Sequence, residues 1–276
     1  YSPLHYRSHN KSLLALDPVN DTVLYRMKLK PVLNLMVGLE PTYFGGESYL
    51  PLYFFEELSE QYCNKGNQIE EQRLVLQDIK LTALLDEEDA KQIKTSIFTK
   101  INLYERYVDV LGHQFMSPIN SLAPQFYKFF IDDTLIVDNR ECIKLFFIPR
   151  NQYDMGFMGN IIIANDGTYE LVSANLTIPE KSNVNYVDRI EFVQKYKTDS
   201  IYIKGEKRKI NYIAEDAIYA KINFYSLKTY GYSINTYSKP SFEEYIPKKE
   251  KDLKDFKLND SSRLSLLTET ERKTYL

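Results

Sequence analysis

Tryptophan is absent from this sequence of 276 residues, and only two cysteines and three histidines occur. So few histidines and cysteines leave little to bind a transition metal, and neither Cys-x-x-Cys nor His-Glu-x-x-His spacing is found. His113 is the only histidine in the middle of the chain, and no Gly-x-Ser-x-Gly motif precedes it. We therefore expect no metal, no cofactor and no serine-type catalytic triad.

The two cysteines, Cys63 and Cys142, both lie in segments with strand-like patterns. We favour two buried free thiols, because cysteine behaves as a small apolar residue in a core. A disulfide between them remains the alternative.

Excess charge and long apolar runs are also missing. The net charge is −3, so broad attraction to nucleic acid is excluded and no nucleic-acid partner is expected. No apolar run approaches the ~20 residues of a membrane-spanning helix. The chain begins with Tyr1 rather than Met, so we expect a processed or excised piece of a longer protein.

Tyrosine and phenylalanine are abundant instead, with 23 and 15 copies. Both suit half-buried, pleated surfaces, and residues 126–237 alternate apolar and polar side chains almost throughout. Asp166-Gly167 between two alternating runs is a strong hairpin signal. We predict a mainly β (α+β) fold, with a curved antiparallel meander sheet or incomplete barrel covered by one or two helices.

One long helix is predicted over residues 86–108. Asp86 can cap its N-terminus, and an apolar stripe at three- and four-residue spacing would pack on the sheet; this stripe comprises Ile93, Ile97, Ile101, Tyr104 and Val108. A second helical turn is expected near residues 117–122, where prolines limit its length.

These patterns divide the chain into three parts. Residues 1–40 form an N-terminal segment that no pattern assigns, apart from one strand or short helix over residues 23–37. Residues 41–238 form the half-barrel domain with its helix. Residues 239–276 form a charged linker and the start of a C-terminal helix, so we expect more chain to follow.

Leu52 to Tyr62 is a predicted strand whose apolar face also carries Glu56 and Glu60. A carboxylate on such a face needs a partner. A hydrolase using these two glutamates is one hypothesis, but a glycosidase needs two carboxylates across a cleft, which one strand face does not supply. We favour salt-bridged or solvated glutamates, and we expect that the domain is not an enzyme.

Four basic residues surround Gly205 at a predicted hairpin tip: Lys204, Lys207, Arg208 and Lys209. A solvated turn that discourages edge pairing is one interpretation. Contact with anionic lipid headgroups is the other.

Six segments together resemble one protein family. They are YLPLYFFEELSE at 49–60, FMSPINSLAPQFYKFFIDDT at 115–134, CIKLFFIPR at 142–150, FMGNIIIANDGTYEL at 157–171, NVNYVDRIEFVQKY at 183–196 and LTETE at 267–271. In this order they resemble large outer-membrane proteins of Bacteroidota. These proteins join a carboxypeptidase-regulatory-like β-sandwich, a middle domain of unknown function and a C-terminal membrane β-barrel, and this chain is similar to the middle domain.

The resemblance implies a location at the periplasmic face of the outer membrane, with the barrel of the same parent chain as partner. It also implies a strand layout similar to lipoprotein-localisation carriers, in which helices plug an apolar concavity that can hold acyl chains. The family brings no catalytic residues to carry over.

Two binding functions follow as hypotheses. The first is a non-catalytic periplasmic domain that acts in partner interaction or gating beside the barrel. The alternative is a carrier-type domain that binds lipid or lipoprotein in an apolar cavity. The residues predicted to line that cavity are Phe54, Leu58, Ile93, Ile97, Ile101, Tyr127, Phe129, Phe147, Ile190 and Phe192.

Overall fold

The computed structural model describes residues 5–16, 42–44, 47–63, 69–80, 88, 98, 100–151, 153–179, 187–203, 205–224 and 227–242. Nearly all its elements are strands. In chain order they are β1 (His5–Leu16), β2 (Thr42–Phe44), β3 (Glu47–Cys63), β4 (Ile69–Lys80), β5 (Tyr107–Val110), β6 (His113–Met116), α4 (Ala123–Phe126), β7 (Tyr127–Val137), β8 (Arg140–Pro149), β9 (Met158–Ala164), β10 (Leu171–Thr177), β11 (Val187–Ile203), β12 (Glu206–Phe224) and β13 (Leu227–Tyr237).

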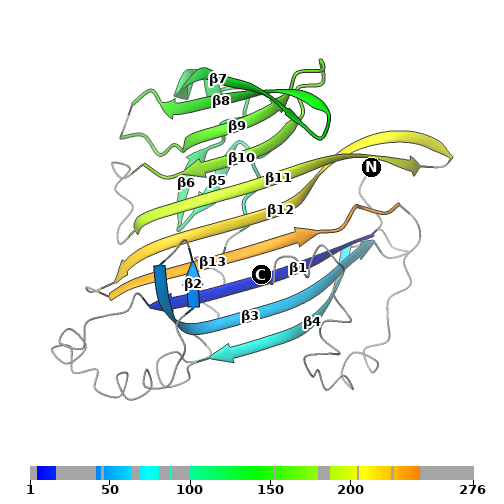
Figure 1. Cartoon of the computed structure of the whole chain (residues 1–276). Helices are drawn as coiled ribbons and strands as arrows, with labels where there is room; N and C mark the ends of the chain where they lie inside the picture. Colours follow the sequence, from blue (N-terminus) through cyan, green and yellow to red (C-terminus); the bar gives the residue numbers. More distant parts are fainter. Residues whose placement is uncertain are drawn as a thin grey trace, which may run out of the picture.

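Eleven strands form one antiparallel sheet, in the order β2-β3-β1-β13-β12-β11-β10-β9-β8-β7, with β4 also paired to β3 (Figure 1). From β7 to β13 every strand pairs with the next one along the chain. The predicted mainly β fold and its antiparallel meander are therefore confirmed. The sheet stays open, with β7 and β4 at its two ends.

Strand β1 comes from the segment that no sequence pattern assigned. It lies between β13 and β3 and pairs with both (Figure 1). Its first half, HYRSHNK, is polar on both faces, whereas four apolar residues of its second half are buried. Because the polar half conceals the alternation, the strand is not evident from sequence. Strand β4 is not evident from sequence either, because its charged residues also conceal the alternation of apolar and polar side chains.

Strands β11 and β12 are longer than the sequence indicated, with 17 and 19 residues. The sequence shows three short apolar runs here, at residues 201–203, 210–213 and 218–224, and all three belong to this one hairpin. A register shift between Lys195 and Tyr196 marks a β-bulge within it, which increases the local twist.

The predicted helix over 86–108 is wrong in its C-terminal part. Glu88 is helical, but Phe98 lies in a bend and residues 100–106 are irregular or in turns and bends. Tyr107–Val110 is strand β5, paired with β6. The other residues of the predicted stretch lie outside the described residues. No helix in the part of the chain that the structure describes is long and apolar enough to cross a membrane.

The error has a physical reason in the turn that joins β5 to β6. Leu111 and Gly112 both have positive φ, 50° and 77°, as the central residues of a type I′ hairpin turn require. The four-residue spacing between Tyr104 and Val108 suits a strand as well as a helix, because four residues complete two strand repeats.

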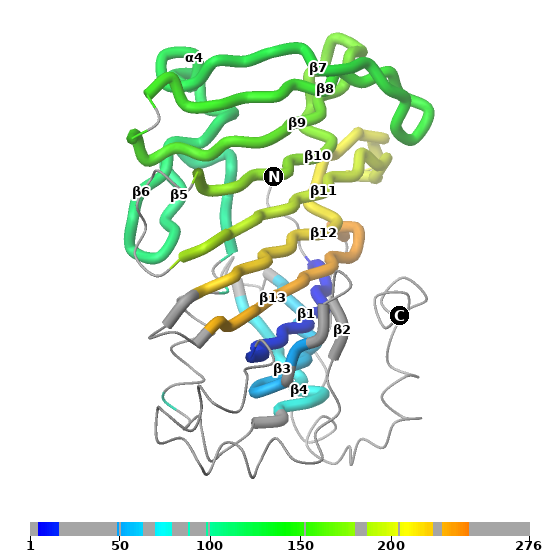
Figure 2. The backbone as a smooth tube through the Cα atoms, turned by 60° about the vertical axis from the view of Figure 1, so that its left-hand side comes forward, coloured from blue at the N-terminus to red at the C-terminus, as the bar shows by residue number. Residues whose placement is uncertain are grey.

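The β5–β6 hairpin lies behind the sheet in Figure 1 and to one side of it in Figure 2. Phe115 of this hairpin stacks on Phe157 with ring centroids 5.0 Å apart, and Phe157 meets Phe192 of β11 edge-on at 5.9 Å. These rings are fully buried in the main hydrophobic core. The face of the sheet that this hairpin packs against is called the covered face below.

The short helix α4 begins at Ala123, so the helical turn predicted for residues 117–122 lies one turn later than expected. Pro124 favours a helix that starts at this point. Proline has no amide hydrogen, and the amide groups of a helix's first turn have no hydrogen-bond partner within the helix, so proline is tolerated there. Cys142 is a buried free thiol, as predicted. The described residues do not include the side chain of Cys63, the element predicted over residues 23–37 or the linker beyond residue 242.

Candidate functional site

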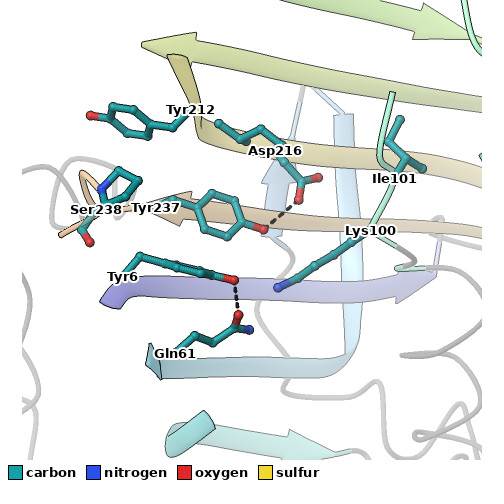
Figure 3. A pocket seen from close by; sticks show the side chains of 10 residues that line it. Tyr6, Gln61, Lys100, Ile101, Tyr212, Asp216, Tyr237 and Ser238 are labelled. Atoms are coloured by element: carbon teal, nitrogen blue, oxygen red, sulfur yellow. Dashed lines mark hydrogen bonds between the residues drawn. The ribbon is translucent and has the colours of Figure 1, made fainter. Parts of the chain in front are cut away.

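A pocket of about 340 Å³ lies on the covered face, where β1, β3, β12 and β13 meet residues 100–101 (Figure 3). Ten residues line it: Tyr6, Gln61, Lys100, Ile101, Tyr212, Ile213, Asp216, Tyr237, Ser238 and Pro240. Its volume is at the lower end of the range for small-molecule sites, about 300–1,000 Å³.

The strand register places the pocket's aromatic side chains together. Tyr6 of β1 is opposite Gln61 of β3, and Tyr237 of β13 is opposite Ser8, two residues further along β1 on the same face. The Tyr6 hydroxyl donates a hydrogen bond to the Gln61 side-chain oxygen, and the rings of Tyr6 and Tyr237 are 6.2 Å apart (Figure 3). Phenolic rings therefore form one wall.

Asp216 of β12 is the acidic group of the pocket, and its side chain is buried. Its Oδ2 accepts hydrogen bonds from the Tyr237 hydroxyl at 3.1 Å and from Asn235 Nδ2 at 3.3 Å. Burial raises the pKa of Asp216 to about 6, against the opposing effects of the Tyr237 hydrogen bond and the nearby Lys100 charge. The Lys100 ammonium lies 5.5 Å from the centroid of the Tyr237 ring, a cation–π contact.

A row of polar side chains crosses the covered face at Asp216. Gln194, Asp216, Asn235 and Asn10 are direct neighbours on β11, β12, β13 and β1. Asn10 Nδ2 donates to Asn235 Oδ1 at 2.8 Å, and Gln194 Nε2 donates to the Ile101 carbonyl at 2.8 Å. The row thereby holds the segment that carries Lys100 against the sheet and satisfies polar groups that burial would otherwise penalise.

The raised pKa of Asp216 predicts a pH dependence of stability. The pKa of Asp216 is about 6 in the folded protein, above its ordinary value of 3.8. Its protonated carboxyl therefore contributes stability that is fully present below pH 3.8 and is lost as pH rises through about 6. Urea unfolding from pH 4 to 7 should show that Asp216→Asn loses less stability over this range than the unsubstituted protein. Equal pH dependence in both proteins would contradict the assignment.

The ten residues predicted to line an apolar cavity fall into three groups. Six belong to the main core or pack against it: Ile101, Tyr127, Phe129, Phe147, Ile190 and Phe192. Of these, Ile101 also lines the pocket. Phe54 packs against a separate cluster with Leu13 on the opposite face, and the alternation along β3 places Leu58 on that face too. Ile93 and Ile97 lie outside the described residues.

Glu56 and Glu60 each have a histidine partner from β1, which satisfies the expectation that such carboxylates need one. His9 Nε2 lies 2.8 Å from Glu56 Oε1 with both side chains buried, and His5 Nε2 lies 2.6 Å from Glu60 Oε2 with both partly exposed. Glu56 has no exposed surface, so the hydrolase hypothesis lacks an open carboxylate there. Among the described residues, no group of three or more His, Cys, Asp or Glu could hold a metal ion.

The basic residues predicted for a hairpin tip lie where β11 turns into β12. Lys207, Arg208 and Lys209 are exposed, and Arg208 pairs with Glu206 at 2.9 Å. Lys204 lies outside the described residues. His113 is exposed on β6.

The pocket itself was missed by sequence reasoning, although one signal was available. Asp216 shares a strand face with Ile218 and Ala220, which are buried in the main core. An acidic residue in such an apolar alternation is the same signal that singled out Glu56.

Fold and pocket together define an open antiparallel β-sheet domain with a small pocket, lined by polar and aromatic side chains, on its covered face. The protein-family model described as "Family of unknown function (DUF5686)" matches residues 46–240. The chain therefore belongs to that family, which agrees with the predicted domain of unknown function. A search of curated proteins found no match.

Solved structures give remote likenesses. A proposed outer membrane lipoprotein-sorting domain from Vibrio parahaemolyticus is 10% identical with a TM-score of 0.28, over 90% of this chain and 88% of that one. A LolA superfamily protein from Nitrosomonas europaea is 9% identical with a TM-score of 0.25, over 90% and 89%. A DUF1329 family protein from Desulfovibrio piger is 10% identical with a TM-score of 0.25, over 91% and 92%. At these scores the likenesses identify no function.

Proposed function

We propose that this domain is a non-catalytic, carrier-type binding domain, and that the pocket at Asp216 takes a small amphipathic molecule. The observation that carries the proposal is the placement of a 7% exposed carboxyl, Asp216, on the wall of an open pocket. Buried ionisable groups with shifted pKa values that converge on a pocket are typical of binding and active sites.

The pocket lining combines two kinds of side chain. Ile101 and Ile213 belong to, or pack against, the main hydrophobic core, so an apolar group in the pocket would continue that core. Asp216, Lys100 and the tyrosine hydroxyls also line the pocket, where a polar headgroup would find hydrogen-bond partners. This combination suits a lipid-like ligand with one apolar and one polar end.

The proposed cellular context rests on the sequence resemblance. We infer that residues 41–238, joined by strand β1, form a middle domain at the periplasmic face of the outer membrane. Residues 239–276 would then connect it to the barrel of the parent chain. A Bacteroidota source belongs to the same inference.

Binding can be tested by titrating the whole chain with lysophosphatidylethanolamine and with palmitate, followed by native mass spectrometry and calorimetry. Ser238 is exposed at the pocket rim, so Ser238→Trp should block the pocket while the core stays intact. We expect one bound lipid and at least about tenfold weaker binding to Ser238→Trp. Thr134→Trp, on the exposed surface of β7, is the matched control and should bind normally. No bound lipid, or equal binding by Ser238→Trp, would disprove the proposal.

Interaction with a protein partner is the second candidate function, and the edge strand β7 favours it. Strand β7 pairs only with β8 among the described strands, and it exposes Ile131 and Ile136 by 73% each and Phe130 by 49%. Such an edge can accept an added strand from another segment. In native mass spectra of the full-length parent isolated from its cells, a bound protein of defined mass that Ile131→Asp abolishes would favour this candidate over lipid carriage.

A further inference from the structure

The tip of the β11–β12 hairpin projects from the rest of the sheet (Figure 1). Strand β10 pairs with β11 only over residues 191–195, and β13 pairs with β12 only over residues 215–224. Beyond those ranges, the pairs from Tyr196–Ile213 to Ile203–Glu206 connect β11 and β12 to each other alone. In its strand pairing the tip is therefore a two-stranded projection. Lys239 contacts it at the Ser200 carbonyl, 2.7 Å away, and at Asp199, whereas Tyr202, Lys207 and Lys209 are exposed.

One face of this tip combines an aromatic ring with two cations. Tyr202 is opposite Lys207, and Ser200 is opposite Lys209, so the alternation of strand side chains places all four on the same face. Tyr202 is 69% exposed, and both lysines are exposed. Arg208 points to the other face and pairs with Glu206, whereas Lys207 and Lys209 form no ion pair with the described residues.

Protection of a strand edge does not account for this arrangement. Charged residues alone would discourage edge pairing, yet an exposed tyrosine ring beside them adds apolar area in contact with water. Tyrosine with neighbouring lysines is instead suited to the boundary between lipid headgroups and acyl chains, where the ring is half immersed and the ammonium groups meet phosphates. The chain as a whole carries a net charge of −3, so attraction to anions would be local to the tip.

We propose that the hairpin tip, through Tyr202, Lys207 and Lys209, docks this domain onto an anionic lipid surface. The surface is separate from the pocket at Asp216, and the inference holds whether or not that pocket binds a ligand. Each basic residue near such a surface strengthens the attraction by about fivefold, and the attraction weakens with salt.

The test is co-sedimentation of the whole chain with phosphatidylcholine vesicles, with and without phosphatidylglycerol. We expect binding only when phosphatidylglycerol is present, and less binding as sodium chloride is added. The double variant Lys207→Glu/Lys209→Glu should bind at least about tenfold more weakly. Tyr202→Ser should bind several-fold more weakly at unchanged charge.

A matched control separates a local site from a general charge effect. Lys128 and Lys228 are exposed on β7 and β13, so Lys128→Glu/Lys228→Glu makes the same change in net charge elsewhere on the sheet. This control should bind vesicles like the unsubstituted protein, and circular dichroism should show all variants folded. The proposal would be overturned by an equal loss of binding in the control or by binding without a preference for phosphatidylglycerol. It would also be overturned if inorganic phosphate released the protein from vesicles more than sodium chloride of the same ionic strength does.

Discussion

Replacement of Gly159 by alanine is expected to lower the free energy of unfolding by about 3 kcal/mol or more. Gly159 has a φ of +151°, and a Cβ atom there would lie 2.0 Å from the carbonyl oxygen of Asn175 on the neighbouring strand β10. That oxygen belongs to the backbone of a paired strand, so it moves only if the β9–β10 pairing is disturbed. Urea unfolding followed by circular dichroism would measure the loss.

Gly167 provides the matched control for this substitution. It also has a positive φ, +84°, but a Cβ atom there would meet nothing within 4 Å. Gly167→Ala should therefore lose only the conformational part, about 1–2 kcal/mol. Losses of the same size at both glycines would show that the close approach of β9 and β10 is unimportant.

Removal of the Glu56 carboxylate is expected to have an effect of similar size. Glu56→Ala would leave His9, which is 1% exposed, without its acidic partner. Breaking one side of a buried pair typically costs about 3–5 kcal/mol, because the remaining polar group stays desolvated. Thermal and urea unfolding at neutral pH would measure this.

The second histidine–glutamate pair on the same two strands is its control. His5 and Glu60 are 21% and 27% exposed, so solvent already weakens their attraction, and Glu60→Ala should cost less than about 1 kcal/mol. If Glu60→Ala destabilised the protein as much as Glu56→Ala, burial would not be the reason for the difference between the pairs.

Sequence reasoning was most successful where the pattern is local. The Asp166-Gly167 hairpin and the alternating strands within residues 126–237 were predicted correctly. Both depend on alternation or turn residues within a few positions. The misassigned stretch at Tyr107–Val110 is equally local, since its spacing fitted two periods and the turn at Leu111-Gly112 was overlooked.

The candidate site depends on contacts that no local pattern contains. Tyr6, Lys100, Asp216 and Tyr237 come from four separate parts of the chain. They meet because β1 lies beside β13 and because Gln194 binds the Ile101 backbone. Glu56 was singled out from its position on an apolar face, but the identity of its partner, His9, required the register of β1 against β3.

The sequence by itself determined that residues 126–237 are mostly strand, although not how long β11 and β12 are, and that alternate side chains face a core, because neighbouring residues on a strand point to opposite faces. Only the tertiary structure decided that β1 lies between β13 and β3 and that a turn-rich segment and a hairpin pack on the covered face. Pairing between distant segments depends on the whole arrangement of strands, and the pocket at Asp216 exists only once that pairing is made.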